Sequence, residues 1–271
     1  MRIAVIHEAS ATPQGYTIFA LAELWQSAGH EVLHLRGPHS YEPADVALLH
    51  VDLSVVPKAY LTLARRYSTT LNLQVTDIRK RHISPNLLKA KDAYTGPVLV
   101  KSNLNHAGIP EQNIPASKSR WAFWKKPPTF TRFSQPKEYP IFPSIAEVPR
   151  HFWKDPLLVV EKFLPEHEDG FYFLRQTYFL GDCHNSWRLR SPHPIIRADD
   201  YLDDVEISTP ESLEAYRREI GLDYGKIDYV EHDGKVTVLD VNKTIGGPAA
   251  PESTPRLAPG IERWVPAAKR P

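Results

Sequence analysis

The sequence has little cysteine, no long apolar run and no excess of charge, and each absence argues against a class of protein. Cys183 is the single cysteine among 271 residues, so an internal disulfide is excluded and we expect a reducing, cytoplasmic location. No uninterrupted apolar stretch approaches the ~18 residues that a membrane span needs. Lys plus Arg total 33 and Asp plus Glu total 32, which leaves no overall field for nucleic acid or an anionic membrane. We therefore expect neither partner; a homodimer is left open.

Two familiar catalytic patterns are also missing. The loop after the first apolar run reads HEASATPQGY, whereas dinucleotide-binding folds carry G-x-G-x-x-G at this place. The sequence shows no pattern of a serine or cysteine triad either. The first hundred residues are therefore read as a scaffold, and the chemistry is sought further along the chain.

The first hundred residues alternate between strand and helix patterns. Apolar runs predict strands at 2–6, 31–35 and 46–51, and amphipathic segments predict helices at 16–29 and 57–67. This β-α-β order indicates a small parallel sheet covered by helices, which we expect to form an N-terminal domain over 1–75.

The later part of the chain is expected to be built mainly from strands and hairpins. Strands are predicted at 97–101 and 157–164, hairpins at 171–191 and 224–242, and a helix at 210–221. The stretch 111–156, rich in proline, aromatics and lysine, is read as a strand-and-loop lid within a central domain over 76–160. The third domain is then 161–271. The acidic stretch 197–206 is expected to be a solvated loop.

The second hairpin carries the side chains that point to chemistry. Counting back from the Asp233-Gly234 turn places Asp228 at roughly the same level as Asp240, and Asn242 shares the face of Asp240 because side chains alternate along a strand. Like charges at this distance repel, whereas a hard cation such as Mg²⁺ prefers such oxygen ligands. The alternative is that these polar groups only close a strand into a turn.

Two segments decide between these readings. KIDYVEHDGKVTVLDVNKTIGG, residues 226–247, and VVEKFLPEHEDG, residues 159–170, together resemble the ATP-grasp enzymes, which include D-alanine–D-alanine ligases, glutathione synthetases and ribosomal-protein glutamate ligases. The resemblance implies an α/β ATP-grasp fold that follows a small parallel α/β domain. It also implies that Asp228, Asp240 and Asn242 hold Mg²⁺, with Mn²⁺ as the substitute.

The same resemblance implies a nucleotide site. Its adenine contacts fall on Glu161 and the backbone near Phe163 and Leu164, with Lys162 beside them. Its ribose contact falls on Glu168, with Asp169 as the alternative. TDIRKRHIS and VLVKSNLNHAG resemble the two lysine segments of the family and point to Lys80 and Lys101 as phosphate ligands. A lysine at the end of a buried strand needs an anionic partner.

Two arginines on one strand and a lysine elsewhere in the chain complete the expected site. Arg188 and Arg190 would share one face of their strand, and the resemblance implies that such an arginine stabilises the transferring phosphoryl group or binds a carboxylate. Lys226 is expected to reach the phosphates.

The resemblance implies an enzyme that uses ATP and Mg²⁺ to join a small-molecule carboxylate to an amine through an acyl phosphate, with release of ADP and phosphate. Two alternatives stay open at this point: a kinase of the same fold that phosphorylates a hydroxyl, and a nucleotide-binding scaffold without catalysis. The sequence does not identify the carboxylate or the amine.

Overall fold

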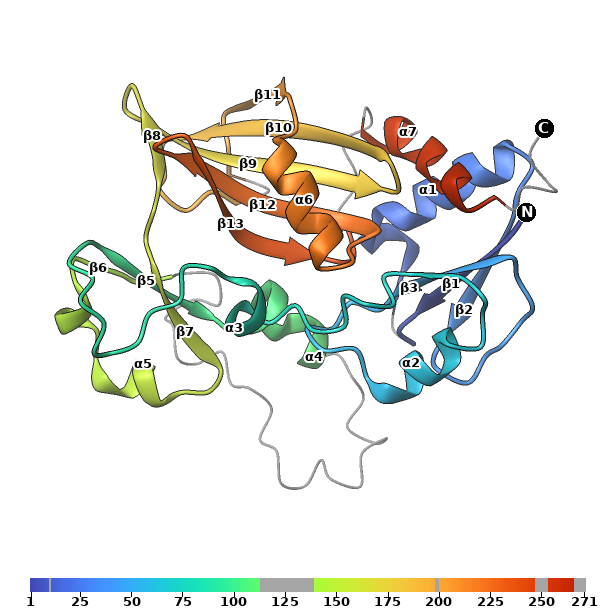
Figure 1. Ribbon diagram of the computed structural model, residues 1–271, viewed down its shortest axis with the longest axis horizontal. Helices are drawn as coiled ribbons and strands as arrows, with labels where there is room; N and C mark the ends of the chain where they lie inside the picture. Colours follow the sequence, from blue (N-terminus) through green and yellow to red (C-terminus); the bar gives the residue numbers. More distant parts are fainter. Residues whose placement is uncertain (10, 113–138, 198–199, 247–252, 266–271) are drawn as a thin grey trace.

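The computed structural model describes residues 1–271 except 10, 113–138, 198–199, 247–252 and 266–271 (Figure 1). The described residues form a mixed α/β fold that contains a parallel sheet, a small antiparallel sheet and a large antiparallel sheet. The predicted α/β class and the N-terminal parallel sheet are confirmed. Much of the predicted lid lies outside the described residues.

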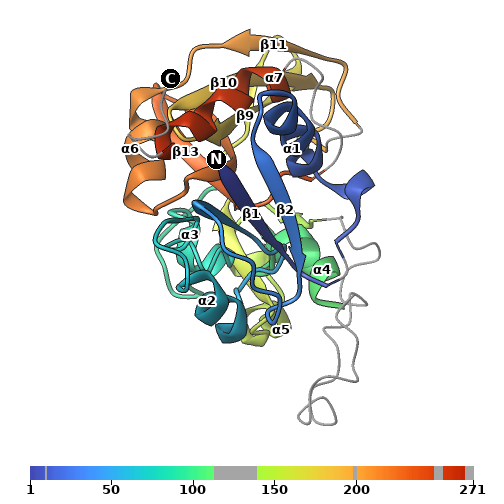
Figure 2. The same ribbon diagram turned by 90° about the vertical axis from the view of Figure 1, so that its right-hand side faces the viewer.

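The parallel sheet has the strand order β2-β1-β3-β4 and is covered on both faces. Its strands are β1 (Arg2–His7), β2 (Glu31–Arg36), β3 (Val46–His50) and β4 (Thr70–Leu71). Helix α1 (Thr17–Ser27) lies over one face of the sheet and helix α2 (Lys58–Ala64) over the other (Figure 2). Ile3 and Val5 pack in one cluster with α1, whereas Ala4 and Ile6 pack in another with α2. Burial on both faces explains why β1 and β3 are almost wholly apolar.

A buried histidine lies at the carboxyl end of β1. His7 Nε2 is 2.9 Å from His34 Nδ1, and the His7 ring stacks on Phe19 with 5.0 Å between centroids. The ring of His50 lies 5.2 Å away. Burial, followed by the nearby His34 and Arg36, lowers the pKa of His7 from its ordinary 6.5 to about 3.

This shift predicts a loss of stability in acid. Below pH 6.5 the unfolded chain protonates His7, whereas the folded chain does so only near pH 3, so the free energy of unfolding falls by up to ~1.4 kcal/mol per pH unit from this group. The His7→Leu variant lacks this contribution and should lose less stability between about pH 6.5 and about pH 4. Urea unfolding of both proteins over this range measures the difference, and parallel curves would contradict the assignment.

The small sheet has the order β6-β5-β7 and is antiparallel throughout. Its strands are β5 (Val98–Ser102), β6 (Ile141–Phe142) and β7 (Leu158–Lys162), and helix α5 (Arg150–Lys154) lies beside β7. β7 crosses the predicted domain boundary at 160/161, and the domain boundaries stay a prediction.

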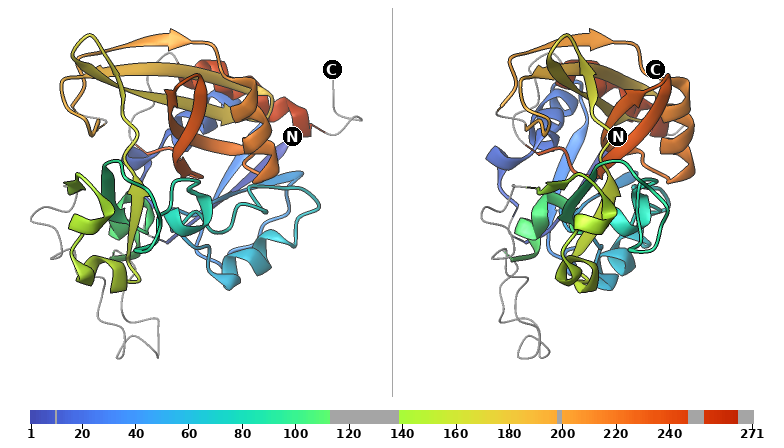
Figure 3. Two further views of the ribbon diagram at one scale, coloured as in Figure 1. Left: turned by 60° about the vertical axis from the view of Figure 1, so that its left-hand side comes forward. Right: turned by 90° about the vertical axis from the view of Figure 1, so that its left-hand side faces the viewer.

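The large sheet has the order β11-β10-β9-β12-β13, with β8 paired to β9 (Figure 3). Its strands are β8 (Glu166–Glu168), β9 (Phe171–Leu180), β10 (Cys183–Ser191), β11 (Asp203–Ile207), β12 (Tyr224–His232) and β13 (Lys235–Asn242). Helix α6 (Glu211–Glu219) packs on one face through Leu213. Both predicted hairpins are confirmed, and Asp233 and Gly234 take the positive φ values, 51° and 69°, that a tight hairpin turn requires.

One predicted loop is wrong. The acidic stretch expected to be a solvated loop contains β11, in which Asp203 pairs with Arg190 of β10. Strand β11 lies at the edge of the sheet, and Val205 is 57% exposed. An edge strand held by main-chain hydrogen bonds needs no apolar alternation, so its sequence resembles that of a loop.

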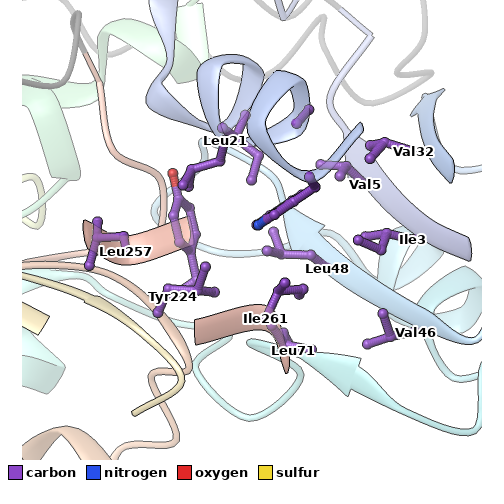
Figure 4. Packing of buried hydrophobic residues seen from close by; sticks show 14 of the residues in the cluster. Ile3, Val5, Leu21, Val32, Val46, Leu48, Leu71, Tyr224, Leu257 and Ile261 are labelled. Carbon is purple, nitrogen blue, oxygen red and sulfur yellow. The ribbon is translucent and has the colours of Figure 1, made fainter. Parts of the chain in front are cut away.

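The C-terminal segment returns to the parallel sheet. Helix α7 (Ser253–Leu257) and the 3-10 helix η7 (Ala258–Trp264) bring Leu257 and Ile261 beside Tyr224 and the apolar residues of β1 and β3 (Figure 4). Trp25 Nε1 donates to the carbonyl of Ala258 at 2.9 Å. No helix in the described ranges combines the length and the apolar character needed to cross a membrane.

Asn72 joins the parallel sheet to the large sheet. Its side-chain amide donates to the carbonyls of Tyr224 and Lys243, and its carbonyl oxygen accepts the N–H groups of Asp223 and Tyr224, over distances of 2.8–3.2 Å. The residue is fully buried and has φ = 62°, a conformation that Asn tolerates better than most residues. The start of β12 and the end of β13 are thereby fixed against the end of the parallel sheet.

Candidate active site

A cavity of about 180 Å³ is lined by residues of both the small and the large antiparallel sheet. It contains eight of the side chains expected from the sequence: Lys80, Lys101, Glu161, Lys162, Phe163, Leu164, Asp228 and Asp240. Most of its remaining lining is apolar, from β9, β12, β13 and the segment 194–196. The structure therefore brings residues that are up to 160 positions apart in the sequence to one cavity.

The segment 163–165 carries the chain from β7 to β8 and lines the cavity. Its path is fixed by the main chain, because the Phe163 N–H donates to Pro97 O at 2.9 Å and the Lys162 N–H donates to Asn86 O at 2.9 Å. The Lys162 ammonium lies 5.4 Å from the centre of the Tyr94 ring. The expected adenine segment thus connects the two sheets that enclose the cavity.

Lys101 and Glu161 form a buried ion pair on neighbouring strands. Lys101 Nζ lies 2.6 Å from Glu161 Oε2, and the two residues are 6% and 1% exposed. Lys101 also donates to the carbonyl of Leu239 at 3.0 Å. Within the described residues, Glu161 Oε1 is buried and makes no hydrogen bond. A buried acceptor without a donor at a cavity wall is a place for a ligand N–H.

The closing hairpin sets Asp228 and Asp240 level with one another, as predicted, through an interruption of its ladder. Asp228 lies opposite Asp240, and Lys226 lies opposite Asn242. The ladder is interrupted between Asp228 and Tyr229, so Leu239 has no opposite residue and lines the cavity together with Asp240. The interruption also leaves the Leu239 carbonyl to accept from Lys101, a detail that the sequence pattern does not reveal.

Each aspartate of the hairpin has a lysine partner. Lys80 Nζ contacts Asp240 Oδ1, and Lys226 Nζ lies 3.0 Å from Asp228 Oδ1. Burial raises the pKa of Asp228, and Lys226 opposes this shift. Burial by itself would lower the pKa of Lys226, but the Asp228 carboxylate and Tyr178 raise it above its ordinary value. The aspartates are therefore not the mutually repelling pair that the sequence alone suggests.

The oxygen donors of this hairpin are of the type that Mg²⁺ and Mn²⁺ bind. Two carboxylates lie level with one another, Asn242 follows Asp240 on the same face, and the Lys226 ammonium group lies 3.0 Å from Asp228 Oδ1. The described part of the chain contains no group of three or more His, Cys, Asp or Glu side chains gathered for a metal. Magnesium commonly takes one or two carboxylates and completes its shell with water and phosphate oxygens, so these residues fit it. The assignment stays a prediction.

The loop after β5 holds the two expected phosphate lysines together. The N–H of Lys80, which begins helix α3 (Lys80–Ile83), donates to the carbonyl of Asn103 at 2.9 Å, two residues after Lys101. The loop then turns through His106, Ala107 and Gly108 with φ values of 44°, 54° and 78°. Left-handed conformations cost non-glycine residues about 1–2 kcal/mol, and such strain clusters at functional sites.

Three of the expected residues do not line the cavity and pair elsewhere. Arg188 contacts Glu166 at 2.8 Å and Glu168 at 2.7 Å, and Arg190 pairs with Asp203. The Glu168 side chain is 60% exposed. Lys226 and Asn242 are also not among the lining residues, although both belong to the hairpin that contributes the two aspartates.

The structure adds residues to the cavity that the sequence reading missed. Tyr139 lines it, and burial, followed by the charges of Asp240 and Glu161, raises the pKa of Tyr139 to about 12. Arg197 opposes that shift, so its charge also acts at this place. Arg197 directly follows the lining segment 194–196. The signal available in the sequence was the apolar pair Ile195-Ile196 beside this arginine.

Comparison with known proteins identifies the fold. No protein-family model and no curated protein sequence matches the chain significantly. Among solved structures, D-cycloserine synthetase DcsG is 11% identical with a TM-score of 0.54, and the match covers 98% of this chain and 100% of that chain. The ATP-grasp ligase PsnB, complexed with minimal precursor, Mg and ADP, is 11% identical with a TM-score of 0.51 and coverages of 89% and 88%.

A further similar structure is macrocyclase MdnC from Microcystis aeruginosa, bound with precursor peptide MdnA, at 11% identity, a TM-score of 0.50 and coverages of 97% and 99%. These matches extend over both the parallel domain and the two antiparallel sheets. The chain therefore has the ATP-grasp fold.

Proposed function

We propose that the protein is an ATP- and Mg²⁺-dependent carboxylate–amine ligase. The observation that carries this proposal is the composition of one cavity. It combines apolar walls, two buried lysines, two aspartates and a buried carboxylate oxygen for which the described part of the chain offers no hydrogen-bond donor. A nucleotide triphosphate with its metal needs these features together, because its base is flat and apolar and its phosphates are anionic.

The adenine is assigned to the part of the cavity lined by β7 and the segment 163–165. Glu161 Oε1 would accept the adenine amino group, and the backbone near Leu164 would contact the ring edge. Lys162 and the apolar side chains of β9 complete the slot. The ribose is assigned to Glu168; its present partner is Arg188, so a nucleotide would share that carboxylate with an arginine.

The phosphates are assigned to the part lined by Lys80, Lys101 and the closing hairpin. Asp228, Asp240 and Asn242 would hold Mg²⁺, which neutralises charge on the β- and γ-phosphates when bound. Lys80 and Lys101 would contact phosphate oxygens. Lys226 orients Asp228 through their ion pair.

The chemistry follows from these contacts. A substrate carboxylate oxygen forms a bond to the γ-phosphorus while the bond from that phosphorus to the β-bridging oxygen breaks, and ADP leaves. The amine then attacks the acyl carbon, the C–N bond forms, and the bond to the phosphate oxygen breaks with loss of a proton from nitrogen. The protein contributes positioned charge, and no side chain acts as a nucleophile. Arg197 follows the cavity lining directly, so we place it nearer to the transferring group than Arg188 or Arg190.

The similar structures support this proposal in two respects. PsnB is complexed with Mg and ADP, which is the product expected of the reaction above. DcsG is a synthetase of a small molecule, and MdnC is bound with a precursor peptide. The carboxylate and the amine of this chain can accordingly belong to small molecules or to a peptide.

Product analysis tests the reaction. The protein is incubated with ATP, Mg²⁺, a pool of carboxylic acids, and hydroxylamine as a general amine. The proposal predicts ADP together with a hydroxamate that depends on one acid of the pool. A phosphorylated alcohol would indicate the kinase, tight ATP binding without turnover would indicate the scaffold, and AMP with pyrophosphate would contradict the acyl-phosphate route.

The nucleotide preference is a second test. Guanine presents a carbonyl where adenine presents an amino group, and this carbonyl would face the oxygen of Glu161. We expect Mg·ATP at about 100 times its Kd to raise the free energy of unfolding by ~2.7 kcal/mol, and Mg·GTP at the same concentration to raise it far less. Thermal unfolding with each nucleotide measures this. Equal stabilisation by GTP would contradict the adenine assignment.

A further inference from the structure

Two lysines and two aspartates form a neutral group at the closing hairpin. Lys80 contacts Asp240, Lys226 lies 3.0 Å from Asp228, and Asp228 and Asp240 are opposite one another in the ladder. We call Lys80, Lys226, Asp228 and Asp240 the lysine–aspartate quartet. Its two positive and two negative charges sum to zero, so both carboxylates that the proposed function gives to Mg²⁺ already have a cation beside them.

The quartet is held in place by its surroundings. The Lys80 side chain is 5% exposed, and its backbone N–H is bonded to the loop after β5. The side chains of Lys226, Asp228 and Asp240 are 19%, 16% and 25% exposed. Lys80 is therefore the more deeply enclosed of the two ammonium groups. A lysine that loses its aspartate here is left with a poorly solvated charge.

This arrangement sets lysine and metal in competition for the same oxygens. A free divalent cation would raise the charge of the quartet from zero to two positive and would take the counter-ion of each lysine. Mg·ATP carries two negative charges overall, its phosphate oxygens give Lys80, which lines the cavity, a new anionic partner, and the complex adds no net positive charge beside Lys226. A free divalent cation therefore leaves both lysines without an anionic partner, whereas Mg·ATP supplies phosphate oxygens to Lys80.

We propose that Lys80 and Lys226 are resident counter-ions that keep the two aspartates closed to a free divalent cation, and that the metal enters only together with a nucleotide. This inference rests on the proposed function, since it takes the hairpin as the metal site. It assigns the lysines a second task beyond contact with phosphate: they make metal binding conditional on the nucleotide.

Binding of Mn²⁺, measured by equilibrium dialysis as the excess of the ion on the protein side with and without AMP-PNP, tests the inference without turnover. Wild-type protein should bind Mn²⁺ alone weakly, and Lys80→Met should bind it alone at least about 10-fold more tightly, because a competing cation is removed. The same variant should bind AMP-PNP less tightly than wild type, since a phosphate contact is lost. One substitution is thus expected to change the two affinities in opposite directions.

Three variants serve as controls. Lys91→Met removes an exposed lysine and should leave both affinities unchanged. Lys80→Met combined with Asp240→Asn should lose the gain in Mn²⁺ affinity, because the released ligand is then also weakened. Lys80→Gln removes the charge but keeps a donor for Asp240, and it replaces Lys80→Met if circular dichroism shows that the Met variant is unfolded.

The outcomes separate this inference from the proposed function. If wild type binds Mn²⁺ alone as tightly as Lys80→Met does, the counter-ion role is overturned while the metal site stands. If wild type fails to bind Mn²⁺ even with AMP-PNP present, the metal site of the proposed function is overturned and the inference with it. Nucleotide-dependent Mn²⁺ binding in wild type, together with the gain in Lys80→Met, supports both.

Discussion

Asp240→Asn is expected to reduce turnover by at least about 100-fold and to abolish stabilisation by Mg·ATP. The substitution keeps the shape of the side chain but removes a charged oxygen from the predicted metal site. Loss of an outer-shell partner of a metal ligand already costs about 10–100-fold, so loss of a ligand itself should cost more. Steady-state ADP release and thermal unfolding with and without Mg·ATP measure the two effects.

The same substitution should also destabilise the protein without ligands. Because two aspartates that face one another repel, removal of one charge alone would be expected to leave the free energy of unfolding unchanged or to raise it. Lys80, however, is 4% exposed and takes Asp240 as its counter-ion, so we expect a loss of about 1–3 kcal/mol, the range for a hydrogen bond to a charged group. Asp233→Asn at the exposed hairpin turn is the matched control and should change neither property. An Asp240→Asn protein that Mg·ATP stabilises as it does wild type would contradict the metal assignment.

Lys101→Met is expected to have the largest effect on stability. It leaves Glu161, which is 1% exposed, as a carboxylate without its cation. Breaking a buried ion pair from one side typically costs about 3–5 kcal/mol, whereas replacing both partners costs far less. The double variant Lys101→Met with Glu161→Gln should therefore regain most of the stability that the single variant loses.

Nucleotide binding separates the structural role of this pair from its functional role. The double variant should be well folded and yet bind Mg·ATP weakly, because it lacks both the phosphate lysine and the adenine carboxylate. Urea unfolding and calorimetric titration of the two variants test these expectations. A double variant that is no more stable than Lys101→Met would show that the two side chains are not energetically coupled.

The elements predicted correctly from the sequence are those set by residues close together along the chain. The apolar runs of β1 and β3 are buried on both faces, and the Asp233-Gly234 turn sets the register of the hairpin as far as the pair Tyr229–Val238. Beyond that pair the ladder is interrupted, and the extra residue Leu239 brings Asp240 opposite Asp228. The hairpin and its turn were therefore accessible from the sequence, whereas the pairing of the two aspartates depends on the interruption.

Features that depend on contacts between distant parts of the chain could not be predicted from the sequence. The pairing of Lys80 with Asp240 joins residues 160 positions apart, and Lys101 donates to the carbonyl of Leu239, 138 positions away, where the β12–β13 ladder is interrupted. Tyr139 and the segment 194–196 line the cavity without any motif, since an apolar wall places few demands on residue type. Arg188 and Arg190 fit a motif but pair with carboxylates outside the cavity lining.

Photolabelling with 8-azido-ATP tests most directly whether the cavity between the two sheets is the nucleotide site. We predict that the label is found on peptides that contain 161–165, 172–174 or 194–196, and that excess ATP suppresses it. A second groove, lined by 82–85 and by residues of α6 and β13, provides an internal comparison. Labelling of that groove, or labelling that ATP does not suppress, would contradict the assignment of the nucleotide to this cavity.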